Sequence, residues 1–376
     1  MKRILLNFSI LLGLVVVSCD NADLSQEQNA KNDNSLMQRQ SSMFSYIEST
    51  QINNGVDCEN NILIFPTWEK YWETIEVLDQ MIENDCDSFD ATVPNNITDD
   101  QYDALADAAG FDEDNVLRKF EEDLAFCSLR RKIESLENDW LDQQGDGQWD
   151  INADPDNHFI DDETERTLLS QNAEVIIGSK ERGYVYYKFI DDEGNWIEVH
   201  NNDTQAISQV SQGNIPTNNP NVVVVTPKRD ETGGSACKDR VTNKGYHYGP
   251  NNTRVKQIDK LRRETGIGDS KIKAKTKGYK KKNGKWRARR TWITAGINAQ
   301  INSNPGTCFI KCGQDIEVLK HKEKRRRRVK VKHSIPQYVG IDPERRWLTI
   351  KNNSVYALHK QGQILVVNPD FYDNQQ

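Results

Sequence analysis

Apolar residues recur at spacings of three and four between residues 67 and 141, which is the pattern of amphipathic helices. Thr67 is a suitable N-cap for the first helix, and Thr98 begins a capping box before the second. Two further apolar stripes run over residues 116–124 and 129–140. The longest stripe belongs to the first helix and consists of Trp68, Tyr71, Trp72, Ile75, Leu78 and Ile82. We therefore expect four short helices that pack on one another through these stripes.

From residue 174 the apolar pattern changes to the short alternating runs that are typical of strands. Three strands are predicted, over residues 175–178, 184–190 and 196–199. We expect them to form a small hairpin appended to the helices. Residues 201–236 are rich in Asn, Gln, Ser, Thr and Pro, which is typical of a linker, here interrupted by a short strand at 222–225.

After Cys237 the pattern is mostly that of strands. Alternating runs are found at residues 271–278, 286–295, 324–333 and 354–367. Asn283 and Gly284 lie between the first two runs and form a strong hairpin signal, whereas residues 253–264 predict one short helix. The expected fold class is α+β. A small helical domain with an appended β-hairpin is followed by a mainly antiparallel β domain, either a sandwich or an open barrel.

The N-terminal segment has the organisation of a secretory signal. Lys2 and Arg3 precede a mainly apolar run from Ile4 to Val17, which is short for a membrane span. Val16-Val17-Ser18-Cys19 resembles the lipobox of bacterial lipoproteins, although a residue smaller than Val17 is commoner there. The resemblance implies that the signal is cleaved before Cys19 and that acyl chains on Cys19 anchor the protein to a membrane. An ordinary secretory signal with an incidental cysteine is the alternative.

Residues 20–42 are polar and without periodicity, which predicts a disordered tether. Asp20 and Asp23 follow the cysteine closely, and acidic residues in this place resemble the export signals of Bacteroidota surface lipoproteins. Together with the layout of the chain, the resemblance implies an uncharacterised lipoprotein of the outer membrane or cell surface, with periplasmic retention as the alternative. The expected parts are a signal peptide (1–18), a lipidated tether (19–42), an acidic helical domain with its hairpin (43–200), a linker (201–236) and a basic β-rich domain (237–376).

The net charge changes from negative to positive near residue 236, where the pattern also becomes mostly that of strands. The formal net charge is −8, but residues 20–236 hold 46 acidic and 14 basic side chains, and residues 237–376 hold 11 acidic and 33 basic ones. The small total therefore conceals two strongly opposed segments. This excludes a single electrostatically uniform domain.

Cysteine usage agrees with export. Six cysteines remain when Cys19 is set aside, and an even number in an exported protein is compatible with disulfides. They are Cys58, Cys86, Cys127, Cys237, Cys308 and Cys312. Three lie in each segment, so complete pairing would need at least one disulfide between the segments. Free buried thiols are an equal alternative.

The segment 142–165 holds nine carboxylates, yet no calcium-loop frame is complete. Counted from Asp142 the twelfth position is Ala153, and counted from Asp154 the sixth is Phe159 instead of glycine. We expect a solvated acidic loop rather than a calcium site. The same carboxylates could supply the acid and base of an envelope enzyme that acts on glycans, and this is the alternative function.

No motif for zinc, phosphate loops, serine nucleophiles or cysteine proteases is present. The six histidines are scattered and form no metal or triad pattern. We therefore expect neither a cofactor nor an enzymatic activity.

The basic hairpin carries the most informative pattern. A two-residue turn at Asn283 and Gly284 would place Lys277 opposite Arg290 and Lys275 opposite Trp292. One face would be apolar, while the other interleaves cations with aromatic rings, as in surfaces that bind phosphates or sulfates and stack on bases or sugars. The candidate ligand-binding residues are Lys275, Lys277, Tyr279, Lys281, Trp286, Arg290, Trp292, Arg326 and Arg328.

Three roles are open for this face. It could bind an external anionic polymer, such as polysaccharide, lipopolysaccharide or extracellular nucleic acid. It could instead bind only the acidic domain of the same chain, or its tryptophans could pack beneath another layer with lysine stems over them. The sequence therefore predicts a cell-envelope binding or structural surface component.

Overall fold

The computed structural model describes residues 43–50, 58, 61–158, 160–191, 195–226, 240–250, 252–262, 268–305, 315–337 and 346–368. The chain divides into two compact units, Met1–Tyr46 and Ile47–Gln376. The second unit contains the acidic helices and the basic strands alike, so the predicted linker lies within one compact unit. The predicted signal peptide, Cys19 and the tether lie outside the described residues.

Four amphipathic helices form where the apolar spacing predicts them. They are α2 (Trp68–Asp90), α3 (Asp99–Ala108), α4 (Asn115–Asp123) and α5 (Leu129–Asp142). Thr67 caps α2 and Ser128 caps α5, each through a side-chain oxygen that accepts a backbone N–H. Thr98 makes the predicted capping box at α3. None of the helices in the described part of the chain is long and apolar enough to cross a membrane.

Shorter elements complete the helical part. They are the 3₁₀ turns η2 (Ile151–Ala153) and η3 (Pro155–Asn157), and the helices α6 (Glu163–Thr167) and α7 (Thr204–Ser211). The helix α7 was not predicted, since its residues were assigned to the linker. It forms because Ala206 and Val210 are both buried against the neighbouring sheet.

That sheet extends the predicted hairpin at both edges. Its strands are β1 (Glu48–Ser49), β2 (Leu63–Phe65), β3 (Glu174–Ser179), β4 (Gly183–Phe189), β5 (Trp196–Val199) and β6 (Val222–Val225), in that order. The strands β2 and β3 are parallel, and the other neighbours are antiparallel. The three strands and the short strand at 222–225 are thus confirmed.

The C-terminal part consists of two antiparallel sheets. The first, called the basic sheet here, has β10 (Lys285–Ala288), β9 (Gly268–Lys282), β8 (Thr253–Arg262) and β7 (Arg240–Gly249) in this order, with β13 (Arg328–Gln337) also paired to β9. The second sheet has the order β12 (Asp315–Arg326), β11 (Thr291–Pro305), β14 (Arg346–Gln361) and β15 (Ile364–Asn368).

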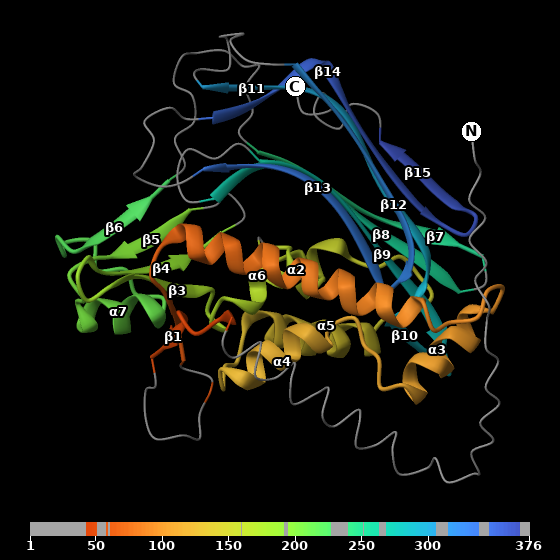
Figure 1. Ribbon diagram of the computed structural model, residues 1–376, viewed down its shortest axis with the longest axis horizontal. Coiled ribbons are helices and arrows are strands. Elements are labelled where there is room, and N and C mark those ends of the chain that lie inside the picture. The colour runs from red at the N-terminus through yellow and green to blue at the C-terminus, as the bar shows by residue number, and fades with distance from the viewer. Residues whose placement is uncertain are drawn as a thin grey trace, which may run out of the picture. The chain divides into compact units, whose positions relative to one another are not determined.

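The two sheets pack face to face and confirm the predicted mainly antiparallel sandwich. Their shared core is mainly apolar, although His359 of the second sheet contacts Asp259 and Thr276 of the basic sheet within it. Its apolar members are Leu261, Ile272, Ala274, Val329 and Val331 from one sheet and Ile293, Ala295, Ile297, Ala299, Val318 and Ala357 from the other. Figure 1 shows the second sheet, the basic sheet and the long helix α2 as successive layers. The basic sheet therefore has one face in the sandwich core and the other toward the helices.

The helix predicted over residues 253–264 is wrong. Residues 253–262 form β8, which is paired along its whole length with β7 on one side and β9 on the other, and residues 263–264 lie outside the described residues. Val255 and Leu261 point into the sandwich, and the residues between them alternate in strand fashion. Backbone pairing on both edges outweighs the helical spacing of three apolar residues.

The register at the predicted turn is confirmed only near the turn itself. Trp286 lies opposite Lys281, but β10 ends at Ala288 and β11 then enters the second sheet. The strand β13 takes the place expected for the return strand, with Arg328 opposite Lys277. Gly278 is where the partner changes, and a Cβ there would lie 3.0 Å from the Thr291 side chain, so glycine permits the close crossing.

The sandwich core makes a prediction about stability. Leu261 is fully buried, whereas Leu319 is 70% exposed on the outer face of the second sheet. We expect Leu261→Ala to lower the free energy of unfolding by about 2–5 kcal/mol and Leu319→Ala to change it by less than about 0.5 kcal/mol. Urea unfolding followed by circular dichroism measures both. Equal losses in the two variants would contradict the sandwich packing.

Candidate functional site

The face of the basic sheet that points away from the sandwich carries a dense array of cations. Alternation along the strands places them on one side, and the register sets them opposite one another: Lys256 and Arg328 both pair with Lys277. We call this array the basic face. Its members are Arg254, Lys256, Lys260, Lys271, Lys273, Lys275, Lys277, Arg328, Lys330 and Lys332.

Carboxylates of the segment 154–165 lie directly on the basic face. The Lys256 Nζ is 2.6 Å from Asp154 Oδ2, and the Lys275 Nζ is 2.6 Å from Glu163 Oε1. Lys273 is 2.7 Å from Asp161. All of these side chains are about nine-tenths buried or more, so the ion pairs are shielded from water.

Asp156 occupies the centre of this contact. Its Oδ2 accepts hydrogen bonds from Lys256 and Lys277, and its Oδ1 accepts one from Arg166 at 2.7 Å. From α5, Glu137 accepts hydrogen bonds from Lys277 at 2.6 and 2.7 Å and from the Tyr279 hydroxyl at 2.9 Å. Asp156 of η3 and Glu137 of α5 therefore pair with three cations, which are Lys256, Lys277 and Arg166.

The pKa shifts follow from this mutual neutralisation. Burial by itself would raise the pKa of Asp156, but the charges of Lys256, Lys275 and Lys277 hold it well below its usual range. For Glu163, Lys275 and Arg328 overcome the same burial effect and lower the pKa to about 2. Burial would lower the pKa of Lys277, yet Asp156 and Glu137 raise it. Asp156, Glu163 and Lys277 are therefore charged at neutral pH.

The run of four arginines at residues 325–328 is neutralised in the same way. Arg325 lies 3.2 Å from Asp99, and Arg326 lies 2.7 Å from Asp90. Arg327 and Arg328 both reach Asp114, which begins α4. Each arginine of the run therefore meets a carboxylate from the helical part.

A linear stripe on α2 completes the contact. Asp79, Glu83, Asp87 and Asp90 recur at helical spacing and so lie on one side of the helix. Asp79 pairs with Lys330 and Lys332, Glu83 with Lys322, Asp87 with Lys324, and Asp90 with Arg326. These pairs are more exposed than those of Asp156 and are correspondingly weaker.

Aromatic rings surround Arg254 at the edge of the basic face. Its guanidinium lies 4.1 Å from the Trp149 ring centroid, 4.5 Å from that of Tyr248 and 4.4 Å from that of Trp286. Arg254 also donates to the Asp146 carbonyl at 2.7 Å. Of the rings expected to stack on a ligand, Trp286 thus lies against a cation of the same chain.

The structure brings together most of the predicted ligand-binding residues, but beneath the acidic part. Lys275, Lys277, Tyr279, Trp286, Arg290 and Arg326 are buried, and Arg328 is half-buried. Lys281 forms a partly exposed pair with Asp146. Trp292 is 51% exposed on the second sheet, because the chain passes from the basic sheet to the second sheet before this residue. The prediction of an external polymer on this face stays a prediction.

The solvated acidic loop expected at 142–165 is wrong for most of its carboxylates. Asp154, Asp156, Asp161, Asp162, Glu163 and Glu165 are buried, because lysines of the basic face compensate their charge. No group of side chains with the makeup of a metal site is found within the described residues. The general acid of a glycosidase needs a raised pKa, and the pKa of Glu163 is shifted the opposite way.

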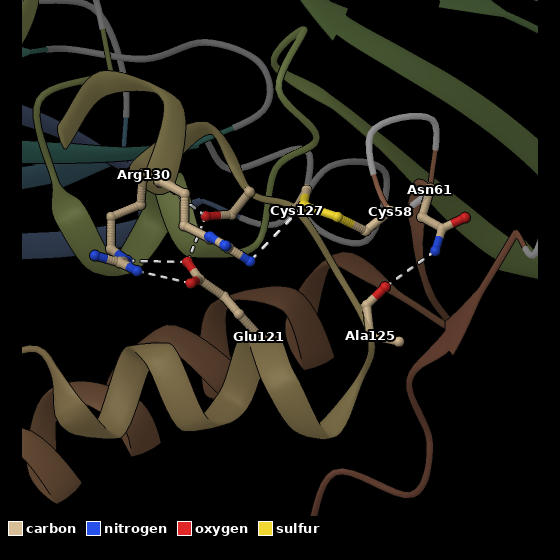
Figure 2. The surroundings of a disulfide bond; sticks show 8 residues. Cys58, Asn61, Glu121, Ala125, Cys127 and Arg130 are labelled. Atoms are coloured by element: carbon tan, nitrogen blue, oxygen red, sulfur yellow. Dashed lines mark hydrogen bonds and ion pairs between the residues drawn. A yellow bond between two sulfur atoms is a disulfide. The ribbon is translucent and has the colours of Figure 1, made fainter. Parts of the chain in front are cut away.

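A disulfide fixes the loop that leads into α5. Cys58 and Cys127 are bonded, and Cys86 is a buried free cysteine, so not all six cysteines pair; the other three lie outside the described residues. Figure 2 shows this disulfide beside the buried pair of Glu121 and Arg130, in which Arg130 donates to both carboxylate oxygens at 2.6 and 2.9 Å. These links hold the start of α5, and hence Glu137, in place.

The carboxylates that hold the basic face were not singled out from the sequence, apart from those in 142–165. The acidic stripe of α2 could have been found from its spacing of four residues. Glu137 gives no such signal, because it is one of four acidic residues on its helix.

Comparisons with known proteins identify no family of known activity. No family model and no curated protein matches the chain. Among solved structures, a weak likeness is found to the crystal structure of a DUF4848 family protein from Bacteroides thetaiotaomicron VPI-5482. It has 10% sequence identity and a TM-score of 0.18, and it covers 84% of this chain and 96% of that chain. So low a TM-score supports no inference about fold or function.

The central position of Asp156 makes a second prediction. Asp156→Asn removes the carboxylate that pairs with the buried Arg166 and that Lys256 and Lys277 share, and we expect it to lower the free energy of unfolding by about 3–5 kcal/mol. Asp142→Asn is the matched control, since its partners Lys285 and Arg287 lie at the surface. Urea unfolding at neutral pH compares them. A loss of similar size in both variants would show that burial of the pair is irrelevant.

The depressed carboxylate pKa values predict the pH dependence of stability. Asp156, Asp162 and Glu163 have lower pKa values in the folded chain than in the unfolded chain. Their stabilisation is therefore complete above about pH 5, beyond the unfolded-state values, and is lost as the pH falls through the folded-state values. Thermal melts between neutral pH and about pH 2 should show a progressive loss below about pH 5, and an acid branch without this loss would refute the assignment.

Proposed function

We propose that the protein is an exported, lipid-anchored binding or structural component of the bacterial envelope, and that its basic face binds the acidic part of the same chain. The observation that carries the proposal is the pairing of the basic face with carboxylates of α2, α5, η3 and α6. This favours the intramolecular partner over an external polymer among the roles open from the sequence.

The energetics support the intramolecular partner. A polymer lying along the basic face would have to displace Asp156, Asp161 and Glu163 from lysines that are almost completely buried. Exposing one member of such a pair costs about 3–5 kcal/mol. A phosphate contact at the surface gains most of its free energy from counterion release, and cations already paired with carboxylates have few counterions to release.

The anchor is supported by the sequence alone. The lipobox-like residues before Cys19, and Asp20 and Asp23 after it, favour attachment to the outer membrane or cell surface. An acyl anchor suits a surface component. The buried ion pairs suit a protein that stays folded when the ionic strength changes, because buried ion pairs are screened much less than exposed ones.

Heparin chromatography tests the intramolecular pairing. Because the basic face is occupied, we expect the folded chain to elute from heparin below about 150 mM salt. Retention to much higher salt would overturn the proposal and favour the external polymer.

A pair of single variants on α2 sharpens this test. Asp79→Asn removes the carboxylate that pairs with Lys330 and Lys332 of the basic face and should delay elution. Glu73→Gln makes the same change of charge on the same helix, but Glu73 pairs with Lys70 and not with the basic sheet. An equal delay in both variants would show that only net charge matters.

Metabolic labelling with palmitate tests the anchor. The wild-type chain should incorporate label and sediment with membranes, whereas Cys19→Ala should lose both properties, because Cys19 is the proposed site of acylation. A Cys19→Ala chain that stays with the membranes would contradict the anchor at this residue.

A further inference from the structure

The outer face of the second sheet carries the four most exposed large apolar side chains of the described residues. Leu319 is 70% exposed, Leu365 60%, Val367 52% and Trp292 51%. Leu319 and Trp292 lie apart on β12 and β11, whereas Leu365 and Val367 lie together on β15. Apolar side chains scattered singly on a surface are ordinary, but a group of them indicates contact with another molecule. The grouped pair on β15 is therefore the stronger sign of such a contact.

The strand β15 forms one margin of the second sheet (Figure 1), and β14 is its one partner among the described strands. A two-residue turn joins β14 to β15, so that Gln361 lies opposite Ile364. The pair beside such a turn exchanges both of its backbone hydrogen bonds, and every second pair along the strands repeats this. Leu365 and Val367 are out of phase with Ile364. They therefore direct their backbone N–H and C=O groups toward the open edge of the sheet.

The other edge strands of the described sheets are protected against pairing with another chain. Proteins usually block an edge with charges, prolines or short length. The strands β7, β10, β12 and β13 each carry at least two Lys or Arg residues, β1 has two residues, and β6 lies between Pro220 and Pro227. The sequence of β15 is Ile-Leu-Val-Val-Asn, with neither charge nor proline, and Pro369 follows it. The edge of β15 is thus open to pairing over these five residues.

Both ends of β15 are fixed to the basic sheet. The buried side chain of Ile364 fills the space beside Gly249 of β7, where a Cβ would lie 2.6 Å from Ile364 Cδ1. At the other end, Asn368 Nδ2 donates to Asp259 Oδ2 of β8 at 2.5 Å. The open edge is therefore held in the strand conformation before any partner arrives, which lowers the entropic cost of pairing.

We propose that β15 pairs with β15 of a second copy of this chain, antiparallel and about a twofold axis at Val366. In this register Leu365 lies opposite the partner's Val367, and Val367 opposite the partner's Leu365. The outward N–H and C=O groups of both residues then bond to those of the partner, and the exposed side chains pack against each other as cross-strand pairs. The inference does not rest on the proposed function.

The twofold arrangement also explains why pairing would stop at two copies. A contact in which one surface meets the same surface of another copy is closed, and it leaves no second β15 edge free. The opposite margin of the second sheet is β12, whose charges oppose further strand addition. The contact is far smaller than the roughly 800 Å² per partner of stable complexes, so the dimer is expected to be weak.

Disulfide trapping in the full chain tests the register and detects a weak contact. In the proposed dimer the two copies of residue 366 face each other with Cα atoms about 4.5 Å apart, which a disulfide can span. We expect Val366→Cys to give a disulfide-linked dimer under mild oxidation, with the linked peptide identified by mass spectrometry. Leu365→Cys is the matched control, because its two copies are separated by more than the roughly 7 Å that a disulfide allows. A mixture of Leu365→Cys and Val367→Cys chains should link one to the other, which tests the register without changing Val366.

Sedimentation velocity over a concentration series tests the affinity. Leu365→Lys brings an ammonium group into the contact, and we expect it to weaken self-association by about tenfold or more. Leu319→Lys makes the same change at the most exposed leucine of the same sheet face, but away from β15. It should leave self-association unchanged.

Three results would overturn the proposal. The first is trapping of Leu365→Cys with itself as fast as of Val366→Cys, or no trapping in either the Val366→Cys chain or the mixture. The second is an equal loss of self-association in Leu365→Lys and Leu319→Lys, which would mean that the whole face associates without register. The third is a monomeric Val366→Cys chain whose thiol resists a maleimide reagent, because another segment of the same chain would then cover the edge.

Discussion

The structure depends on the neutralisation of a polycationic sheet by carboxylates brought from distant parts of the chain. Lys256, Lys273 and Lys275 could not be buried alone, because desolvating an unpaired ammonium group costs several kcal/mol. The carboxylates of residues 154–163 face the same penalty. The lysines and the carboxylates can therefore be buried only when they pair with one another. The helical part and the sandwich accordingly form one compact unit.

This constraint explains why the two faces of the basic sheet are stabilised by different interactions. The face toward the second sheet is mainly apolar and is stabilised by burial of Leu261, Ile272 and Val329. The face toward the helices is charged and is stabilised by ion pairs between its cations and the carboxylates of the helical part. Apolar contact tolerates small displacements, whereas buried ion pairs do not, so the charged face fixes which helix lies over which strand. The disulfide of Cys58 and Cys127 and the buried pair of Arg130 and Glu121 secure α5 at the margin of this contact.

Charge matching is not uniform across the contact. It is closest around Asp156 and looser along α2, where partners are partly exposed. Under the proposed function, a self-neutralised interface of this kind would resist general polyanions, because its cations are occupied.

The sequence by itself determined the local elements: the capped helices α2, α3 and α5, the turn at Asn283 and Gly284, and the alternation that makes one face of β9 cationic. These depend on neighbours within a few residues, which the pattern displays. Only the tertiary structure decided that β8 is a strand, that β13 replaces β11 beside β9, and that Lys277 meets Glu137 rather than solvent. Those outcomes depend on contacts between residues far apart in the chain, such as Lys277 and Glu137, which are 140 positions apart. The many similar charges in the sequence offer many equivalent pairings, from which only packing can select.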